Sequence, residues 1–137
     1  MVFYITKEEV MQTNKGLVFL YSQSHAVQQE ANLDHVLDRM QHYGENIAGS
    51  REKTLKKAAY LLYHLAYDAH VFADGNKRTA LTSTLFFLHH NGLGFPSETD
   101  SKEKQEEIAG FMKDTAEGKK SLSAVYRWLD LVVVKQE

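Results

Sequence analysis

The sequence predicts an all-α, single-domain fold over residues 1–137, built from about six helices around a central antiparallel pair. Three observations support this prediction. Leu and Ala (15 and 12 residues) are about twice as frequent as Val and Ile (10 and 3), a balance that favours helices over strands. Proline, which breaks helices, occurs only at Pro96. The length of 137 residues suits one domain with one core.

The first helix is predicted from a capping box at Thr6–Glu9, in which the Thr6 hydroxyl and the Glu9 carboxylate each accept from an otherwise unpaired backbone N–H. This helix would run to about Ser22, and its apolar face would carry Val10, Leu17, Val18 and Tyr21. A shorter helix is expected after Asn32.

The central helix is expected to start after Ser50, because apolar residues follow helical spacing from Leu55 to Ala69. Its alanines would allow a neighbouring helix to approach closely. A basic cluster occupies its first turns: Arg51, Lys53, Lys56 and Lys57. It is interpreted as a solvated face, with contact to a phosphate or an acidic partner as the alternative. The next helix would run from Asn76 to Asn91 and end at Gly92.

Two further helices complete the prediction. Asp100–Glu103 resembles a second capping box, and Ser121 is suited to cap the last helix, which would bury Trp128. The irregular stretch Tyr43–Gly49 could hold a short β-hairpin.

Composition excludes several classes of function. The formal charge of −2 argues against nucleic-acid binding, and the absence of cysteine excludes disulfides and thiolate chemistry. No apolar run approaches the ~20 residues of a membrane span, and the first residues do not resemble a signal peptide. A soluble, cytoplasmic protein with neither a membrane nor a nucleic-acid partner is therefore expected.

The stretch His70–Leu81, between the two central helices, concentrates the groups suited to chemistry on phosphates. A helix start attracts anions through its free N–H groups, and a glycine there lets the backbone approach them. The expected phosphate-binding residues are Gly75, Asn76, Lys77 and Arg78.

Three other residues of this stretch have expected roles. Asp74 would hold Mg²⁺ together with substrate phosphates, although it could also cap the following helix. His70 could accept a proton from an attacking hydroxyl, and Phe72 would anchor the loop in the core. This chemistry is typical of phosphoryl or nucleotidyl transfer.

The stretch resembles the active-site motif of the Fic/Doc family, His-x-Phe-x-[Asp/Glu/Asn]-[Gly/Ala]-Asn-[Gly/Lys]-Arg. The family is all-helical, and the resemblance is greatest to its Doc (death-on-curing) toxin subgroup. Val71, Lys77 and Leu81 replace the Pro, Gly and second Arg that are usual in Fic-type AMP transferases. Gly75 is a mild departure from the Doc pattern, which has Ala in its best-known form.

The resemblance implies an enzyme that uses ATP and Mg²⁺ and transfers the γ-phosphate to a protein hydroxyl. The implied target is translation elongation factor Tu, and the implied outcome is growth arrest. Neither Glu45-Asn46 nor Glu117-Gly118 fits the family's inhibitory helix, so a separate antitoxin protein is the expected restraint. The resemblance also suggests that Tyr43–Ile47 is a flap that positions the target chain.

Two other functions remain open on the sequence alone. One is AMP (nucleotidyl) transfer to a protein hydroxyl, which Gly75 leaves possible. The other is a non-catalytic module that binds a partner through the same fold. A zinc site is not expected, because neither His64 with His70 nor His89 with His90 has the spacing of a helical metal site.

Overall fold

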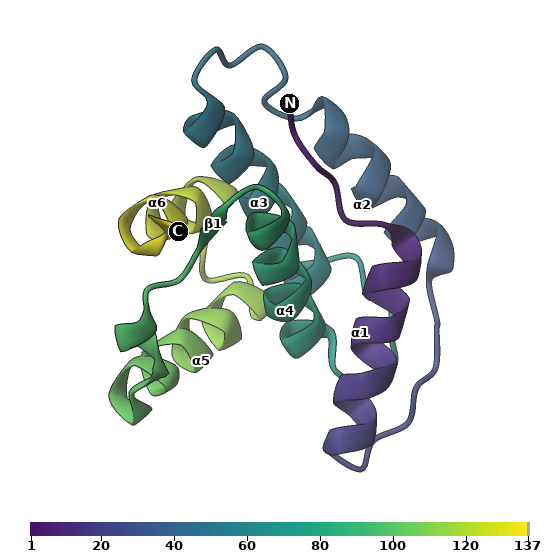
Figure 1. The fold of residues 1–137 in the computed structure, drawn as a ribbon. Coiled ribbons are helices and arrows are strands. Elements are labelled where there is room, and N and C mark those ends of the chain that lie inside the picture. The colour runs from purple at the N-terminus through teal and green to yellow at the C-terminus, as the bar shows by residue number, and fades with distance from the viewer. Residues whose placement is uncertain (137) are drawn as a thin grey trace.

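A central helix organises the molecule. The computed structural model of the protein describes residues 1–136. Helix α3 (Ser50–Tyr67) packs against α4 (Asn76–His90), and this pair separates two peripheral pairs (Figure 1). On one side lie α1 (Lys7–Leu20) and α2 (Glu30–His42); on the other lie α5 (Lys102–Ala116) and α6 (Leu122–Val132). The described residues thus contain the six helices that the sequence predicts, and the all-α fold class is confirmed.

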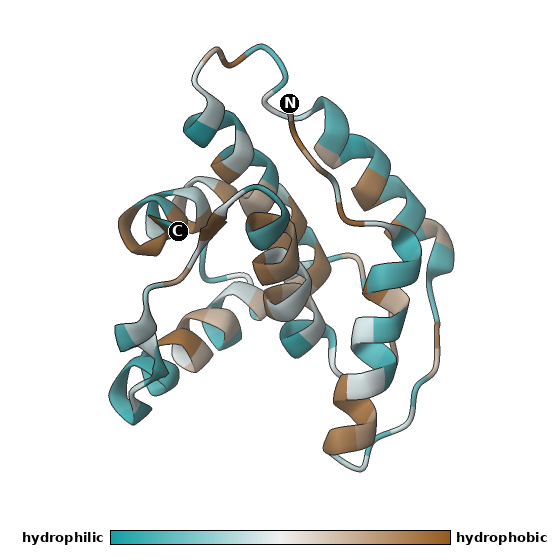
Figure 2. Ribbon diagram, viewed as in Figure 1, coloured by the Kyte–Doolittle hydropathy of each residue, from teal (hydrophilic) through white to brown (hydrophobic). Residues whose placement is uncertain are grey.

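Helix α3 is central because its apolar residues cover more than one face. Leu55, Ala58, Ala59, Leu61 and Leu62 are all fully buried. The two alanines leave room for neighbouring backbones, as expected, and the leucines fill the space between helices. Figure 2 shows the same pattern, with apolar segments of α3 and α4 turned toward the middle of the molecule.

The starts of two helices agree with the sequence. Thr6 accepts a hydrogen bond from the Glu9 backbone N–H while the Glu9 carboxylate accepts one from Thr6, which completes the predicted capping box. Ser121 caps α6 by accepting from the backbone of Ala124. Each cap satisfies N–H groups that would otherwise lack a partner.

Other boundaries differ from the prediction. Helix α1 ends at Leu20 instead of near Ser22, where φ is +55°. Helix α2 begins at Glu30, before Asn32. Helix α5 is capped by Ser101, because Asp100 already belongs to a preceding 3₁₀ turn, η1 (Ser97–Asp100).

The hairpin that Tyr43–Gly49 could hold is not present, and the residues form turns between α2 and α3. The small sheet lies elsewhere: β1 (Leu93–Gly94) pairs antiparallel with β2 (Val134–Lys135). This pairing ties the end of the chain to the loop after α4. Trp128 is half-buried there and stacks on Phe111 at a centroid distance of 4.1 Å, so its predicted place in the core is only partly correct.

Lys57 is fully buried, which contradicts its assignment to a solvated basic face. Its ammonium group donates to the carbonyl oxygens of Met40 (3.2 Å) and Gln41 (2.6 Å), and to the Glu45 carboxylate (2.9 Å). The last carbonyls of a helix lack partners within the helix, so Lys57 caps the end of α2 from α3.

Among residues 1–136, no helix combines the length and apolarity needed to cross a membrane.

Candidate active site

The predicted motif forms the loop that joins α3 to α4, so the structure brings His70 to the end of one central helix and Gly75 to the start of the next. His70 is exposed and has φ of +47°, in the left-handed region that few non-glycine residues adopt. Phe72 is 2% exposed and anchors the loop in the core as predicted. The loop therefore turns its histidine to solvent and its phenylalanine inward.

Asn76 closes the loop. Its side-chain Oδ1 accepts from the backbone N–H of Phe72 (3.1 Å), and its Nδ2 donates to the carbonyl of the same residue (2.7 Å). The sequence assigned this amide to phosphate binding. In the structure the side chain fixes the loop backbone, and its role toward phosphate stays a prediction. The backbone N–H groups at the start of α4 are also suited to an anion.

Gly75 occupies the N-cap of α4 with φ of +78° and ψ of 17°. A Cβ atom there would lie 3.0 Å from Val18 Cγ1 and 3.2 Å from Asn14 Nδ2. Both the backbone conformation and the close approach of α1 favour glycine. Because the cap position belongs to Gly75 and no side chain caps α4, the alternative role of Asp74 as a helix cap is wrong.

Asp74 fits the predicted magnesium role in its chemistry. Its side chain is half-buried, and within residues 1–136 it forms no salt bridge. Nowhere in that range do three or more His, Asp or Glu side chains form a group that could hold a metal. Mg²⁺ typically takes one or two carboxylates and completes its shell with phosphate oxygens and water. Asp74 next to an anion-attracting helix start meets that requirement.

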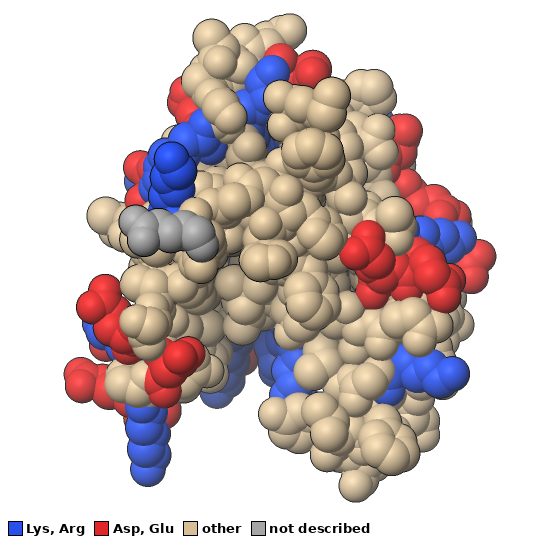
Figure 3. Space-filling model, in the orientation of Figure 1, with Lys and Arg blue, Asp and Glu red and all other residues tan. Residues whose placement is uncertain are grey.

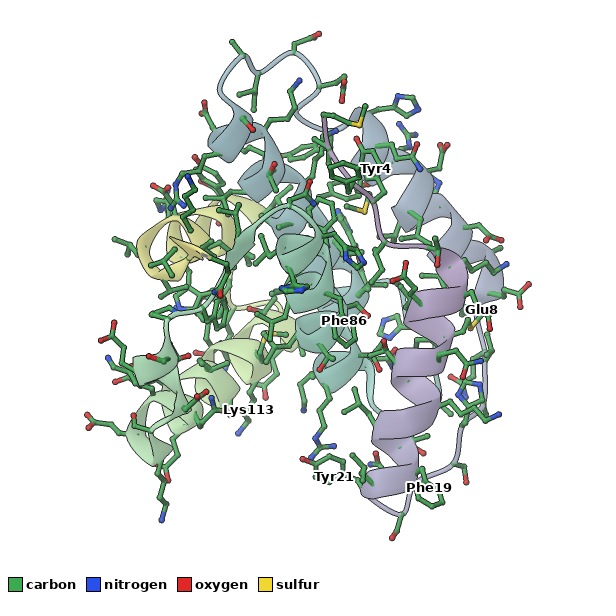
Figure 4. All side chains as sticks on the ribbon, in the orientation of Figure 1. Tyr4, Glu8, Phe19, Tyr21, Phe86 and Lys113 are labelled. Atoms are coloured by element: carbon green, nitrogen blue, oxygen red, sulfur yellow. The ribbon has the colours of Figure 1, made fainter. Side chains whose placement is uncertain are left out.

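Lys77 and Arg78 line a cavity of about 400 Å³ between α4, α5 and the end of α1. The Arg78 guanidinium stacks on the ring of Tyr21, 3.7 Å from its centroid (Figure 4). Tyr21 is 53% exposed, so the prediction that it belongs to the apolar face of α1 is wrong. Two cations beside a helix start give the local positive charge that phosphate binding needs, despite the negative net charge.

Asn14 of α1 reaches the loop from outside the motif, and the sequence analysis missed it. Its side chain is fully buried and donates to the Asp74 carbonyl (2.9 Å) and to Thr79 Oγ1 (3.0 Å). The available signal was its spacing, because Asn14 lies four residues from Val10 and four from Val18 on the buried face. A polar residue in an apolar stripe needs a buried partner.

The segment before α2 also holds the loop. Ala26 accepts from the backbone of Ala73 (2.9 Å), while Gln28 and Gln29 donate to the carbonyl of Val71 (2.8 and 3.1 Å). This segment, and not Tyr43–Ile47, lies beside the loop between α3 and α4. Tyr43–Ile47 precedes α3, whereas His70 follows it, so the helix's 18 residues place them about 27 Å apart along its axis.

The basic cluster of α3 is likewise at the end remote from His70. Arg51 pairs with Asp130 at 3.3 Å, and Lys56 lies over the Tyr126 ring at 3.9 Å. With Lys57 buried, these side chains serve the packing of α3 against its neighbours. Over the middle of the face shown in Figure 3, charged side chains are sparse.

The fold and the loop together define an all-helical domain, with a histidine and a cation-bearing helix start on the loop between its two central helices. The sequence model of the Fic/DOC family matches residues 4–88, which is more than half of the chain and includes the whole motif. The chain belongs to the Fic/DOC family. Members are typically transferases that act on proteins and use nucleotides such as ATP, often with Mg²⁺. No curated protein matches the sequence significantly.

Proposed function

We propose that this chain is a Doc-type toxin, a cytoplasmic kinase that transfers the γ-phosphate of ATP to a hydroxyl of a target protein. The proposed target is elongation factor Tu, whose modification would arrest translation. The observation that carries the proposal is Lys77, followed by Leu81, in an otherwise intact motif. The motif that is usual in Fic-type AMP transferases has a glycine and a second arginine at these two positions.

A physical argument from Lys77 supports phosphotransfer over AMP transfer. Its charged side chain stands on the first turn of α4, where nucleotidyl transfer requires bare backbone against the nucleotide's phosphates. Gly75 had left the nucleotidyl reaction open. Its left-handed backbone conformation and its close contact with Val18 account for a glycine at this position. The glycine is therefore no argument for AMP transfer.

The residues of the chain supply a base and a binding site for the phosphates. His70 accepts the proton of the target hydroxyl as the oxygen attacks the γ-phosphorus. The new bond joins that oxygen to phosphorus, the bond from phosphorus to the bridging oxygen breaks, and ADP leaves. The start of α4, with Lys77 and Arg78, stabilises the phosphate charge. Mg²⁺ held by Asp74 would neutralise further charge on the nucleotide.

We assign target positioning to the segment from His25 to Gln29. It is exposed, and its backbone is already hydrogen-bonded to the catalytic loop. An extended target segment bound along it would bring a hydroxyl close to His70. This assignment replaces the flap that the sequence placed at Tyr43–Ile47.

An apolar groove supports the proposed antitoxin. It lies between α1 and α4, has a volume of about 680 Å³, and includes Leu17, Leu20 and Phe86. Leu20 is 74% exposed and the adjacent Phe19 is 81% exposed. Figure 4 shows Phe19 at the end of α1. We propose that a helix of the antitoxin covers this surface. Co-expression with the product of the adjacent reading frame should relieve growth arrest by the wild type but not by Leu20→Glu. Equal relief of both would contradict the assignment.

The reaction is tested with ATP labelled at either the α- or the γ-phosphate, incubated with the protein and purified elongation factor Tu. The proposal expects label on the target only from γ-labelled ATP. His70→Ala should reduce the rate by about 10²–10⁴-fold, because it removes the general base. His89→Ala, an exposed histidine at the far end of α4, is the matched control and should retain full activity. α-Label on the target would establish AMP transfer instead.

A further inference from the structure

Two asparagines on different helices hold the two ends of the catalytic loop. Asn32 of α2 donates to the carbonyl of Ala69 (2.7 Å), the residue immediately before His70. Asn14 of α1 donates to the carbonyl of Asp74 (2.9 Å), the residue immediately before Gly75. The loop therefore receives an equivalent side-chain donor at each end, from two elements that the motif does not include.

The orientation of the Asn14 amide follows from its partners. A carbonyl oxygen only accepts, so the atom facing Asp74 must be the NH₂ group. The amide oxygen then faces His25 Nδ1 at 2.8 Å, and this ring nitrogen must carry the proton. Asn14 thus joins α1, the segment before α2 and the catalytic loop through one buried group.

Each asparagine is tied to a different half of the loop. Near Asn32, the carbonyl of Val71 accepts from the backbone N–H groups of Gln28 and Gln29, in the segment just before α2, which fixes the backbone around His70. Near Asn14, Thr79 accepts the second amide hydrogen and belongs to the first turns of α4. One half carries the proposed base, and the other carries the groups proposed for metal and phosphate.

We propose that Asn32 and Asn14 are positioning residues with separate roles: Asn32 sets the position of His70, and Asn14 sets that of Asp74 and the start of α4. The inference rests on the proposed function, because it assigns each residue to one part of that reaction. Neither residue needs to touch the substrate. Each acts by satisfying a loop carbonyl that would otherwise lose its hydrogen bond on burial.

Asn→Asp substitutions test these roles, because they replace the donor with an acceptor at nearly constant size. Asn32→Asp should lower kcat on the order of 100-fold, the effect of a misplaced base, and change binding of a non-hydrolysable ATP analogue with Mg²⁺ less than about threefold. Asn14→Asp should weaken that binding roughly tenfold or more. The Ala variants serve as a second pair if an Asp variant fails to fold.

Asn91 offers the matched control. It also donates to backbone carbonyls, those of Phe3 and Phe87 (both 2.8 Å), but at the opposite end of α4 from the loop. Asn91→Asp should lower the melting temperature and leave kcat and nucleotide affinity within about threefold of the wild type. If Asn14→Asp and Asn32→Asp alter the same parameter, alter neither, or match Asn91→Asp, the proposal is wrong.

Two readouts separate this inference from the proposed function, because neither needs nucleotide or target. Asn14→Asp should speed amide exchange of Thr79 roughly tenfold while sparing Gln28 and Gln29, and Asn32→Asp should do the reverse. ¹⁵N NMR of the wild type should show neutral His25 protonated at Nδ1, and Asn14→Ala should remove this preference. Protonation of neutral His25 at Nε2 would overturn the Asn14 assignment even if transfer activity is found. A wild type that passes both tests but modifies no target would overturn only the proposed function.

Discussion

Gly75 packs directly against Val18, so that the start of α4 and the inner face of α1 are in contact at the loop that carries the motif. A Cβ atom on Gly75 would lie 3.0 Å from Val18 Cγ1, closer than side chains normally approach. The contact explains why a residue that the best-known Doc motif fills with alanine is glycine in this chain. It also makes the position of the helix start that is proposed to bind phosphate dependent on the packing of α1.

Gly75→Ala should therefore destabilise the protein by about 1–3 kcal/mol, from the left-handed backbone and the added contact. Val18→Ala removes the contact but leaves the backbone cost. In the Val18→Ala background, Gly75→Ala should cost less by about 0.5 kcal/mol or more. Urea unfolding of the four proteins measures the difference. Strict additivity would show that the contact with Val18 contributes nothing.

Lys57→Met should destabilise the protein by about 1–3 kcal/mol, because it leaves the buried carbonyls of Met40 and Gln41 without a donor. Lys15→Met changes an exposed lysine of α1 and is the matched control, with an expected effect within about 0.5 kcal/mol. Chemical denaturation of both variants provides the comparison. Equal stability of the two would mean that water replaces Lys57 at the end of α2.

The Lys57–Glu45 pair predicts a pH dependence. Hydrogen bonding to the Lys57 ammonium lowers the pKa of the Glu45 carboxyl below its usual 4.5. A carboxyl with a lowered folded-state pKa stabilises the protein above its unfolded-state pKa, and this contribution is lost as pH falls through the folded-state pKa. Glu45→Gln should thus be less stable than the wild type at pH 7, and the difference should shrink below about pH 4.5. A constant difference from pH 7 to pH 3 would contradict the pairing.

Asp74→Asn should raise the Mg²⁺ concentration needed for half-maximal transfer by about tenfold or more, because it removes the charged ligand. Chelation of divalent ions should abolish transfer by the wild type, and added Mg²⁺ should restore it. Asp68→Asn, which changes an exposed carboxylate at the end of α3, should leave the Mg²⁺ requirement unchanged. An Mg²⁺ dependence of Asp74→Asn equal to that of the wild type would remove Asp74 from the metal site.

The helices and the motif could be predicted because their determinants are local. The capping box at Thr6, the cap at Ser121 and the apolar spacing of α3 each lie within a few residues of sequence, and all three are present. Phe72 was assigned to the core by the same motif that placed His70 on the loop, and its burial confirms that assignment.

Contacts between distant segments could not be predicted in this way. Asn14 and Asp74 are 60 residues apart, and nothing in either neighbourhood indicates the other. The interpretation of Lys57 failed for the same reason, since its partners lie at the end of the preceding helix. The glycines around Tyr43–Gly49 indicate a turn, but strands also need a pairing partner, and the structure gives that segment none.

The most direct test of the central claim is the identity of the nucleotide released when the target is modified. Phosphotransfer predicts one ADP per modified target, with a phosphoryl group on the target hydroxyl by mass spectrometry. Both products should disappear in His70→Ala and persist in His89→Ala. Release of pyrophosphate together with an adenylyl group on the target would contradict the account and assign the chain to AMP transfer.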